Sequence, residues 1–338
     1  MNTDPRARDG RLQEAEAGGG GPILRPGRNC WRIATARRAS LLVDADAYFL
    51  RLEQALQRAR RSILILGWDF DASIRLRPDG EDASPPLGDL LRGLVEQHPE
   101  LHVRVLVWSL STLHAPGASL PLLLGAPWQE HPRIDLRMDR RHPLYAAHHQ
   151  KIVCIDDAVA FVGGMDLTVA RWDTSRHKAE DPRRVNPDGS TYGPVHDLQT
   201  IVDGQAAQMV AEVARQRWRG ATGEDIPPAP DAEAAWPEDL EPDFTETDIA
   251  VARTEPGYGG KEPVHETAAL TTDALKAAKR FIYIEAQYLT ARRVRSTLLD
   301  VLSEKDGPEV VVMMTRSPNG VLEWYFMSAN RDRLVRRL

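Results

Sequence analysis

The chain has 338 residues, a formal net charge of −6 at pH 7 and 42% hydrophobic residues, which is typical of a globular protein with one large or two medium domains. The acidic balance argues against a protein that binds nucleic acid nonspecifically. The chain has no stretch of about 18 apolar residues that could span a membrane, and no signal peptide is expected, because residues 1–17 are polar. The two cysteines, Cys30 and Cys154, exclude a disulfide framework. Arginine far outnumbers lysine, which favours a GC-rich bacterial genome.

The first residues are charged and then glycine-rich, so 1–28 are predicted to form a disordered tail. Arginines between positions 25 and 38 form a basic lead-in, either solvated or in contact with anionic lipid headgroups. Apolar spacing then predicts a helix over 47–60 with Asp46 as its N-cap. Helices and strands alternate from there, which indicates an α/β fold. The next predicted elements are a strand over 62–68, a helix over 87–97, a strand over 103–108 and a strand around 134–138.

A short stretch near the middle of the chain carries the strongest chemical signal. His149 and Lys151 are two residues apart, so strand geometry would place both side chains on one face. Asp156-Asp157 predicts a turn, residues 158–162 the returning strand, and Gly163-Gly164 a close approach of the backbone. An imidazole beside an ammonium suits phosphoryl transfer, because a neutral histidine can attack phosphorus while lysine holds the phosphate oxygens.

This hairpin resembles the HKD motif of the phospholipase D superfamily, through the pattern His149-x-Lys151-x4-Asp156 and then Gly163-Gly164-x-Asp166. The following Leu-Thr-Val-Ala-Arg-Trp-Asp resembles the true phospholipase D branch in particular. The resemblance implies a phospholipase D-like fold of tandem α/β units, each with a mixed sheet flanked by helices.

The resemblance also implies roles for these residues. His149 would attack phosphorus, or would protonate the leaving group if the roles are reversed. Lys151 would hold the phosphate oxygens, and Asp156 would fix the motif. Gly164 and Asp166 would lie near the phosphate, although many relatives have asparagine where this chain has Asp166. No metal or cofactor is implied, because histidine and lysine would transfer the proton and stabilise the negative charge themselves.

The segment after the motif adds one candidate. Pro194-Val195-His196-Asp197 begins another predicted strand, and relatives carry a similar Pro-x-His-Asp segment. His196 is therefore either a residue of the phosphate site or a structural, hydrogen-bonded histidine. His177, in the polar loop 174–193, is expected to be exposed and inert. A helix is predicted over 206–220.

The second half of the chain repeats the first. The helix end and strand that begin at Ala55 match those that begin at Ala274, and the strand from Val103 matches the strand from Val310. Residues 222–245 are acidic, proline-rich and without a basic residue, as in a linker. The expected organisation is a tail over 1–28, a first phospholipase D-like unit over 29–221, a linker over 222–245 and the start of a second unit over 246–338.

The second copy carries no His-x-Lys pattern, because no histidine follows His265. In the superfamily two such motifs meet and divide the roles of nucleophile and acid. We therefore expect the second motif to come from a missing C-terminal part, with a homodimer as the alternative. Glu285 lies in an apolar strand that resembles a phospholipase D segment, so it should meet a cation or a histidine of the site.

These patterns favour a phospholipase D-type phosphodiesterase or transphosphatidylase that acts on glycerophospholipids through a phosphohistidine and is inactive as this isolated part. The alternatives are a cardiolipin synthase-like phosphatidyltransferase, an HKD-family nuclease, and a half-site that only binds phosphate or lipid. The expected partner is phospholipid at a membrane surface, and no nucleic acid is expected. The expected location is cytoplasmic, including the inner face of the membrane.

Overall fold

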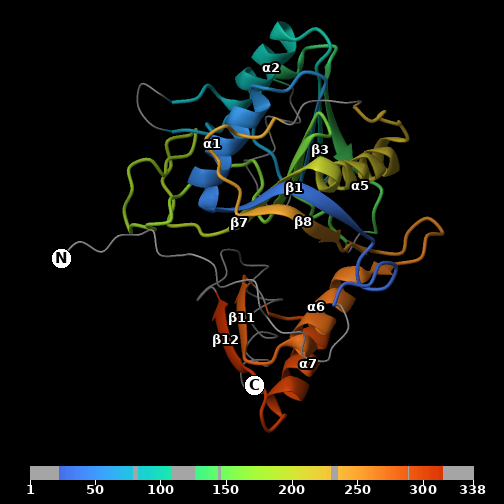
Figure 1. Cartoon of the computed structure of the whole chain (residues 1–338). Helices are drawn as coiled ribbons and strands as arrows, with labels where there is room; N and C mark the ends of the chain where they lie inside the picture. Colours follow the sequence, from blue (N-terminus) through green and yellow to red (C-terminus); the bar gives the residue numbers. More distant parts are fainter. Residues whose placement is uncertain are drawn as a thin grey trace. The chain divides into compact units, whose positions relative to one another are not determined.

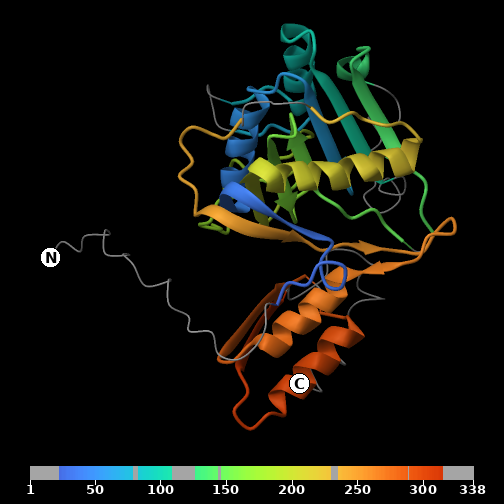
Figure 2. The ribbon, with the colours of Figure 1, turned by 45° about the vertical axis from the view of Figure 1, so that its right-hand side comes forward.

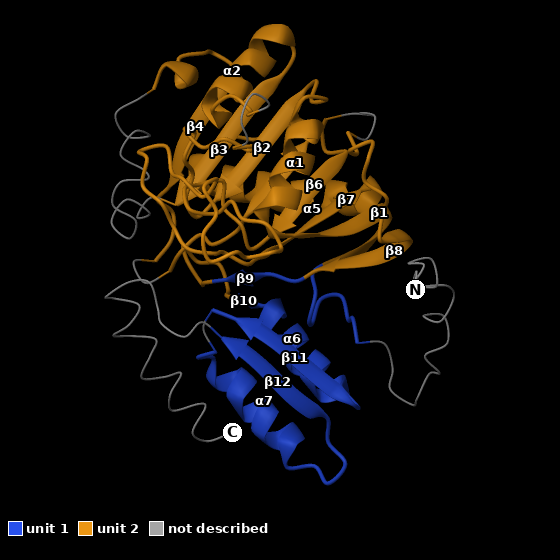
Figure 3. Cartoon of the chain, turned by 90° about the vertical axis from the view of Figure 1, so that its left-hand side faces the viewer, with its two compact units in different colours: residues 1–31, 252–255, 264–338 blue, residues 32–251, 256–263 orange. Residues whose placement is uncertain are grey.

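The computed structural model describes residues 23–78, 83–108, 126–143, 146–229, 235–287 and 289–314. These residues form two compact units, which Figure 3 draws in different colours. The larger unit comprises 32–251 and 256–263, and the smaller unit comprises 252–255, 264–314 and the described residues before Arg32.

The framework of the larger unit is a mixed sheet. Its strands are β1 (Arg32–Val43), β2 (Ser62–Gly67), β3 (His102–Trp108), β4 (Ile134–Asp139), β5 (Ile152–Ile155), β6 (Val159–Gly163), β7 (Leu198–Asp203) and β8 (Phe244–Val251). They lie in the order β4-β3-β2-β5-β6-β7-β1-β8, in which β2, β3 and β4 are parallel and the other neighbours are antiparallel. The α/β fold with a mixed sheet is therefore confirmed.

Helices cover both faces of this sheet. α1 (Asp44–Leu56) and α2 (Leu87–Gln97) pack on one face, where Phe49 and Leu91 join a core with Ile63 and Val105. The alternate residues of the strands, such as Leu64, are also buried and point to the opposite face. α5 (Gly204–Thr222) crosses that face (Figures 1 and 2). A short 3-10 helix, η1 (Pro127–Gln129), packs near α2.

The start of α1 differs from the prediction. The helix begins at Asp44, and Asp46 lies within its first turn instead of capping it. The cap position is Val43, whose side chain cannot accept a hydrogen bond. The backbone N–H of Asp46 donates to the Asp173 carbonyl at 3.0 Å. A loop carbonyl thus satisfies one of the backbone N–H groups that the start of a helix leaves without a partner inside the helix.

Strand β1 is the main element that sequence reasoning missed, because its arginines gave the segment the character of a charged lead-in. β1 pairs with both β7 and β8. Arg37 and Arg38 form ion pairs with the buried carboxylate of Asp203 at 3.1 and 2.8 Å. Arg32 pairs with Glu212 on α5 at 2.8 Å. From Arg32 onward the basic lead-in is thus corrected to a sheet strand whose arginines form ion pairs within the unit, whereas Arg25 and Arg28 precede this strand.

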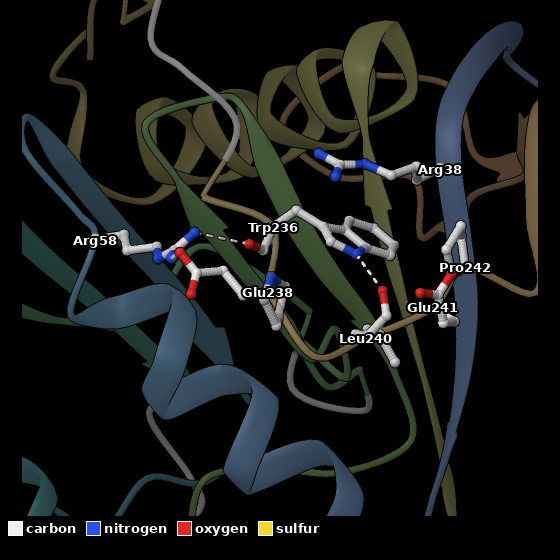
Figure 4. A pocket seen from close by; sticks show the side chains of 8 residues that line it. Arg38, Arg58, Trp236, Glu238, Leu240, Glu241 and Pro242 are labelled. Atoms are coloured by element: carbon white, nitrogen blue, oxygen red, sulfur yellow. Dashed lines mark hydrogen bonds and ion pairs between the residues drawn. The ribbon is translucent and has the colours of Figure 1, made fainter.

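The described part of the expected linker packs on the larger unit. Trp236 is buried, its Nε1 donates to the Leu240 carbonyl at 2.8 Å, and the Arg38 guanidinium lies 4.7 Å from the ring centroid. Arg58 donates to the Trp236 carbonyl at 3.1 Å (Figure 4). The chain then enters β8, so the larger unit extends to Val251 instead of ending near residue 221.

The smaller unit reproduces the start of the larger one. It contains β9 (Thr254–Glu255), β10 (Val264–His265), α6 (Glu266–Ala277), β11 (Phe281–Ala286), α7 (Arg292–Leu302) and β12 (Glu309–Met314). β11 and β12 are parallel with Ile282 opposite Val310, as β2 and β3 are parallel with Ile63 opposite Val103. The residues that match in sequence therefore pair in the same register in both units.

Two expectations concern the ends and the surface of the chain. The predicted tail lies outside the described residues as far as 22, and from Ile23 the chain is held locally, since Asn29 Nδ2 donates to the Ile23 carbonyl at 2.7 Å. Among the helices of the described residues, none has the length and apolar character needed to cross a membrane.

Candidate active site

The motif hairpin folds as the sequence predicted. Asp156 and Asp157 have φ values of 53° and 54° between the antiparallel strands β5 and β6, as a two-residue type I′ turn requires. A Cβ on Gly163 would lie 2.4 Å from the Leu198 carbonyl oxygen, and one on Gly164 would lie 2.1 Å from Asp197 Oδ1. Glycine is needed at both positions, because β7 and Asp197, the residue before it, lie too close to the backbone at 163 and 164 to leave room for a β-carbon.

His149 and Lys151 lie at the edge of the sheet where β2 ends and β5 begins, since Leu66 pairs with Ile152. The strand predicted to include both starts only at Ile152, although the Lys151 carbonyl still accepts the Gly163 N–H at 3.3 Å. The His149 side chain is exposed, and its ring lies edge-on to Trp68 with centroids 6.3 Å apart. An accessible imidazole beside an aromatic wall therefore forms one side of the site.

The structure joins Lys151 to Asp166. Lys151 Nζ lies 3.0 Å from Asp166 Oδ2, and both side chains are buried. Asp166 Oδ1 accepts the backbone N–H of Trp68 at 2.8 Å. Because one carboxylate oxygen is tied to the end of β2, the other holds the ammonium in a fixed position beside His149, whose carbonyl lies 3.4 Å from Nζ.

Desolvation changes the protonation of His149 and Lys151. Although His149 keeps an exposed surface, the surrounding protein removes part of its ring from water and so lowers its pKa; the nearby charge of Lys151 lowers the pKa further, while Asp166 partly opposes the shift. The imidazole is therefore neutral at pH 7, which is the form that can act as a nucleophile. Burial also lowers the pKa of Lys151, and Asp166 partly compensates.

Asp156 lies at the opposite end of β5 from His149 and Lys151. Its Oδ1 accepts the backbone N–H groups of Arg61 and Ser62 at 2.8 and 2.7 Å, and its Oδ2 accepts that of Arg60 at 2.8 Å. The third member of the motif thus ties the turn after β5 to the loop that leads into β2. It positions the strands and does not touch the reacting groups.

Asp197 is a site residue that sequence reasoning missed, although it belongs to the same Pro-x-His-Asp segment that pointed to His196. Its carboxylate packs against Gly164. Burial raises the pKa of Asp197, against the opposing effects of the Leu198 N–H and the charges of Arg171 and Lys151. A carboxyl group that is close to Lys151 and reluctant to ionise can take part in proton handling.

His196 belongs to an Asp–His–His cluster, formed by Asp44, His177 and His196, and Asp44 also accepts the backbone N–H of Asp197 at 3.3 Å. His196 Nδ1 donates to Asp44 Oδ1 at 2.8 Å, and His177 Nε2 lies 3.3 Å from Asp44 Oδ2. The expectation that His177 is exposed and inert is therefore wrong. Asp173 Oδ2 accepts from His177 Nδ1 at 3.1 Å and fixes the ring.

The Asp–His–His cluster has the donor set of a divalent-cation site. One donor atom from each residue lies within 4.8 Å of the others. Asp44 Oδ2 is buried and has no hydrogen-bond partner within the described residues. Two imidazoles and a carboxylate suit zinc and related ions, and the Asp173–His177 pair is the usual second-layer support for a histidine ligand.

His148, the residue before the candidate nucleophile, is buried, with 2% of its surface exposed. Neither ring nitrogen has a hydrogen-bond partner in the described part of the chain, and Nδ1 lies 3.8 Å from Asp139 Oδ2. Burial lowers the pKa of His148 to about 3, with help from the charge of Arg217. It is thus a neutral packing group under the site.

Glu285 belongs to β11 of the smaller unit, where its side chain is exposed. Its Oε1 accepts a hydrogen bond from the Tyr283 hydroxyl at 2.5 Å on the same face of the strand. Exposure to water removes the desolvation cost that led us to expect a cation or histidine partner. The residues that the larger unit brings together at the motif are His149, Lys151, Gly164, Asp166 and Asp197.

Comparisons with known proteins agree on one superfamily. The chain is 29% identical over 208 residues to phospholipase D B of Dictyostelium discoideum, covering 53% of this chain and 17% of the relative. It is 27% identical over 316 residues to phospholipase D gamma 2 of Arabidopsis thaliana, covering 70% of this chain and 37% of the relative. The chain thus spans well under half the length of these relatives. No family model matches it.

Solved structures support the fold. The phosphatidylserine synthase of Haemophilus influenzae Rd KW20 has a TM-score of 0.50 and 12% identity, and the likeness covers 83% of this chain and 63% of that one. At this identity the likeness shows a shared fold.

Proposed function

Because the chain belongs to the phospholipase D superfamily, we propose that it forms part of a phosphodiesterase that hydrolyses or exchanges the headgroup ester of glycerophospholipids. One observation carries the proposal: an exposed imidazole held neutral lies next to a buried lysine that a carboxylate fixes in place. This arrangement offers a nucleophile and a phosphate-binding cation without further groups.

In the proposed first step, a ring nitrogen of His149 attacks phosphorus while Lys151 binds a non-bridging oxygen. The phosphorus–oxygen bond to the leaving alcohol breaks, and the alkoxide takes a proton from an acid. In the second step, water or an alcohol displaces the histidine and regenerates it. Water yields phosphatidic acid, and an alcohol yields an exchanged phospholipid.

The acid in this scheme must be a second group. We propose that it is the histidine of another His-x-Lys motif, contributed by a further part of the polypeptide or by a second copy. Asp197 is the alternative within the described residues, because it is half-buried, carries a raised pKa and lies near Lys151. We further propose that the reaction takes place at a membrane surface, where the lipid ester is presented.

An activated substrate tests the nucleophile separately from the acid. A p-nitrophenyl phosphodiester needs little protonation of its leaving group, so the chain should release nitrophenol and retain an acid-labile phosphoryl label. His149→Ala should abolish both signals, whereas His265→Ala, which removes an exposed histidine of the smaller unit, should leave them unchanged. An undiminished label in His149→Ala would refute the proposed nucleophile.

Natural substrates then separate the lipid proposal from its rivals. The chain, supplied with the missing acid as part of a longer polypeptide, should cleave phospholipid in vesicles and leave plasmid DNA intact. Cleavage of DNA alone would favour a nuclease. Transfer only to a lipid alcohol, without hydrolysis, would favour a cardiolipin synthase-like enzyme.

A further inference from the structure

One cavity of the larger unit is lined by residues 168–172, which follow Asp166 of the candidate active site in the chain. It has a volume of about 550 Å³ and is bounded by the loop that follows β2 and by the chain after Asp166. Its walls are partly apolar, from Ile74, Val169, Val185 and several prolines. Its charged lining residues are Arg75, Arg171 and Arg183, and no aspartate or glutamate lines it within the described residues.

In the described part of the chain, two of these three guanidinium groups donate to backbone carbonyls and not to carboxylates. Arg171 Nη1 donates to the backbone carbonyls of Val169 and Ala170 at 3.4 and 3.2 Å, and Arg75 donates to the Ser84 carbonyl. Neither forms an ion pair with a carboxylate of the part of the chain that the structure describes. Arg183 is different, because Asp181 pairs with it at 2.8 Å and its guanidinium stacks 4.6 Å from the Trp172 ring centroid.

The wall that carries Arg171 is held in place. Asn186 Oδ1 accepts the Ala170 N–H at 2.9 Å, and the Tyr192 hydroxyl donates to the Trp172 carbonyl at 3.0 Å. Ala170 itself has a φ of 54°, a left-handed conformation that a side chain adopts only when its surroundings enforce it. The backbone of the wall that carries Arg171 is therefore fixed by contacts within the protein.

Arg171 connects this cavity with the motif. It lines the cavity, and its charge reaches both Lys151 and Asp197, whose protonation it affects. The chain runs without interruption from Asp166, which holds Lys151, to the wall at 168–172. The phosphate of a substrate bound to Lys151 would therefore lie in the electrostatic field of Arg171.

We propose that this cavity binds a second anionic group of an amphiphilic substrate, so that the protein prefers phospholipids with an anionic headgroup over zwitterionic ones. The guanidinium groups of Arg75 and Arg171 supply the charge complement, and the apolar wall supports the hydrocarbon part of the ligand. The absence of carboxylates from the described lining disfavours a cationic group such as a quaternary ammonium. The inference rests on the proposed lipid function and specifies its substrate class.

Binding to vesicles tests the preference without requiring turnover. Sedimentation of the whole chain with vesicles of phosphatidylglycerol and phosphatidylcholine, against vesicles of phosphatidylcholine alone, should show at least roughly tenfold stronger binding to the anionic vesicles. Arg171→Gln and Arg75→Gln should each remove most of that difference. Arg176→Gln is the matched control, because it removes an exposed arginine of the same loop that does not line the cavity.

Arg171→Gln is the decisive variant, since its hydrogen bonds are local and their loss should leave the fold and melting temperature unchanged. Equal binding to both vesicle types would overturn the proposal, as would an Arg176→Gln variant that loses the preference as fully as Arg171→Gln. Glycerol phosphate or inorganic phosphate bound as tightly as the vesicles would show a site for the free anion. Single-stranded DNA bound with the same arginine dependence would show a nucleic-acid site. Either result would overturn the lipid assignment, while loss of lipid cleavage alone would bear only on the proposed function.

Discussion

The role of Asp156 can be tested directly, because the structure assigns this motif residue a structural role and not a chemical one. Its buried carboxylate accepts three backbone N–H groups, two on Oδ1 and one on Oδ2, at 2.7 to 2.8 Å. Hydrogen bonds to a charged group contribute roughly 1.5–3 kcal/mol each, and they are not additive. Removing all three by Asp156→Gly should therefore cost about 3–5 kcal/mol of unfolding free energy, with the φ of 53° still accommodated.

Two further substitutions separate the contributions of the hydrogen bonds and of the backbone conformation to this loss of stability. Asp156→Asn keeps an oxygen for Arg61 and Ser62 but turns an amide N–H₂ towards the N–H of Arg60, so we expect a loss of about 2 kcal/mol. Asp156→Ala should be about 1 kcal/mol worse than Asp156→Gly, because a β-carbon at positive φ is strained. The exposed His149 should tolerate alanine within about 0.5 kcal/mol.

The assay is urea unfolding followed by tryptophan fluorescence, with activity on the activated phosphodiester measured at low and high temperature. The Asp156 variants should be active in proportion to their folded fraction, whereas His149→Ala should be folded and inactive. An Asp156→Asn protein that is as stable as the original chain and yet inactive would refute this structural role. Asp156 would then have to take part in the reaction itself.

Three other results are expected. The pKa of His148 is near 6.5 in the unfolded chain and about 3 in the folded chain, so the unfolded chain binds this proton first. The free energy of unfolding therefore falls as pH decreases below 6.5, by about 2.5 kcal/mol between pH 7.5 and 4.5. His148→Leu should remove that loss, and an unchanged slope of unfolding free energy against pH would contradict it. Gly164→Ala should cost about 1–3 kcal/mol by displacing the Asp197 carboxylate, whereas Gly193→Ala, with nothing within 4 Å, should be neutral in denaturant titrations. Zn²⁺ at 100 times its dissociation constant should add about 2.7 kcal/mol of stability through the Asp–His–His cluster, measured calorimetrically, and a His196→Ala variant that is stabilised equally would exclude that cluster as the site.

Much of the fold follows from local patterns in the sequence. The helix at 87–97, the strands β2, β3 and β4, and the turn at Asp156-Asp157 lie where spacing and turn residues predicted them. The repeat was also readable, and its matched residues pair in the same register in both units. Such features depend on residues close together in the chain, whose period and backbone preferences do not require a fold to be known.

Elements whose conformation depends on contacts with distant parts of the chain could not be predicted from local patterns. β1 was concealed by its arginines, because only the pairing with β7 and the carboxylate of Asp203 makes a strand of such a charged segment favourable. The proline-rich segment near Trp236 was interpreted as a linker, because nothing local reveals that Arg38 and Arg58 bind it. Tertiary contacts outweighed composition in both places.

The sequence by itself determined the prediction of phosphoryl transfer, since His149, Lys151 and the two glycines form a contiguous pattern. Only the tertiary structure decided which residues surround these groups. It paired Asp166 with Lys151, paired His196 with Asp44 across 152 positions of the chain, and placed Arg171 in the wall of the cavity, from which its charge acts on Lys151. The physical reason is that a short motif encodes its own backbone geometry, whereas partners for buried charge are selected by whichever distant segments the sheet brings together.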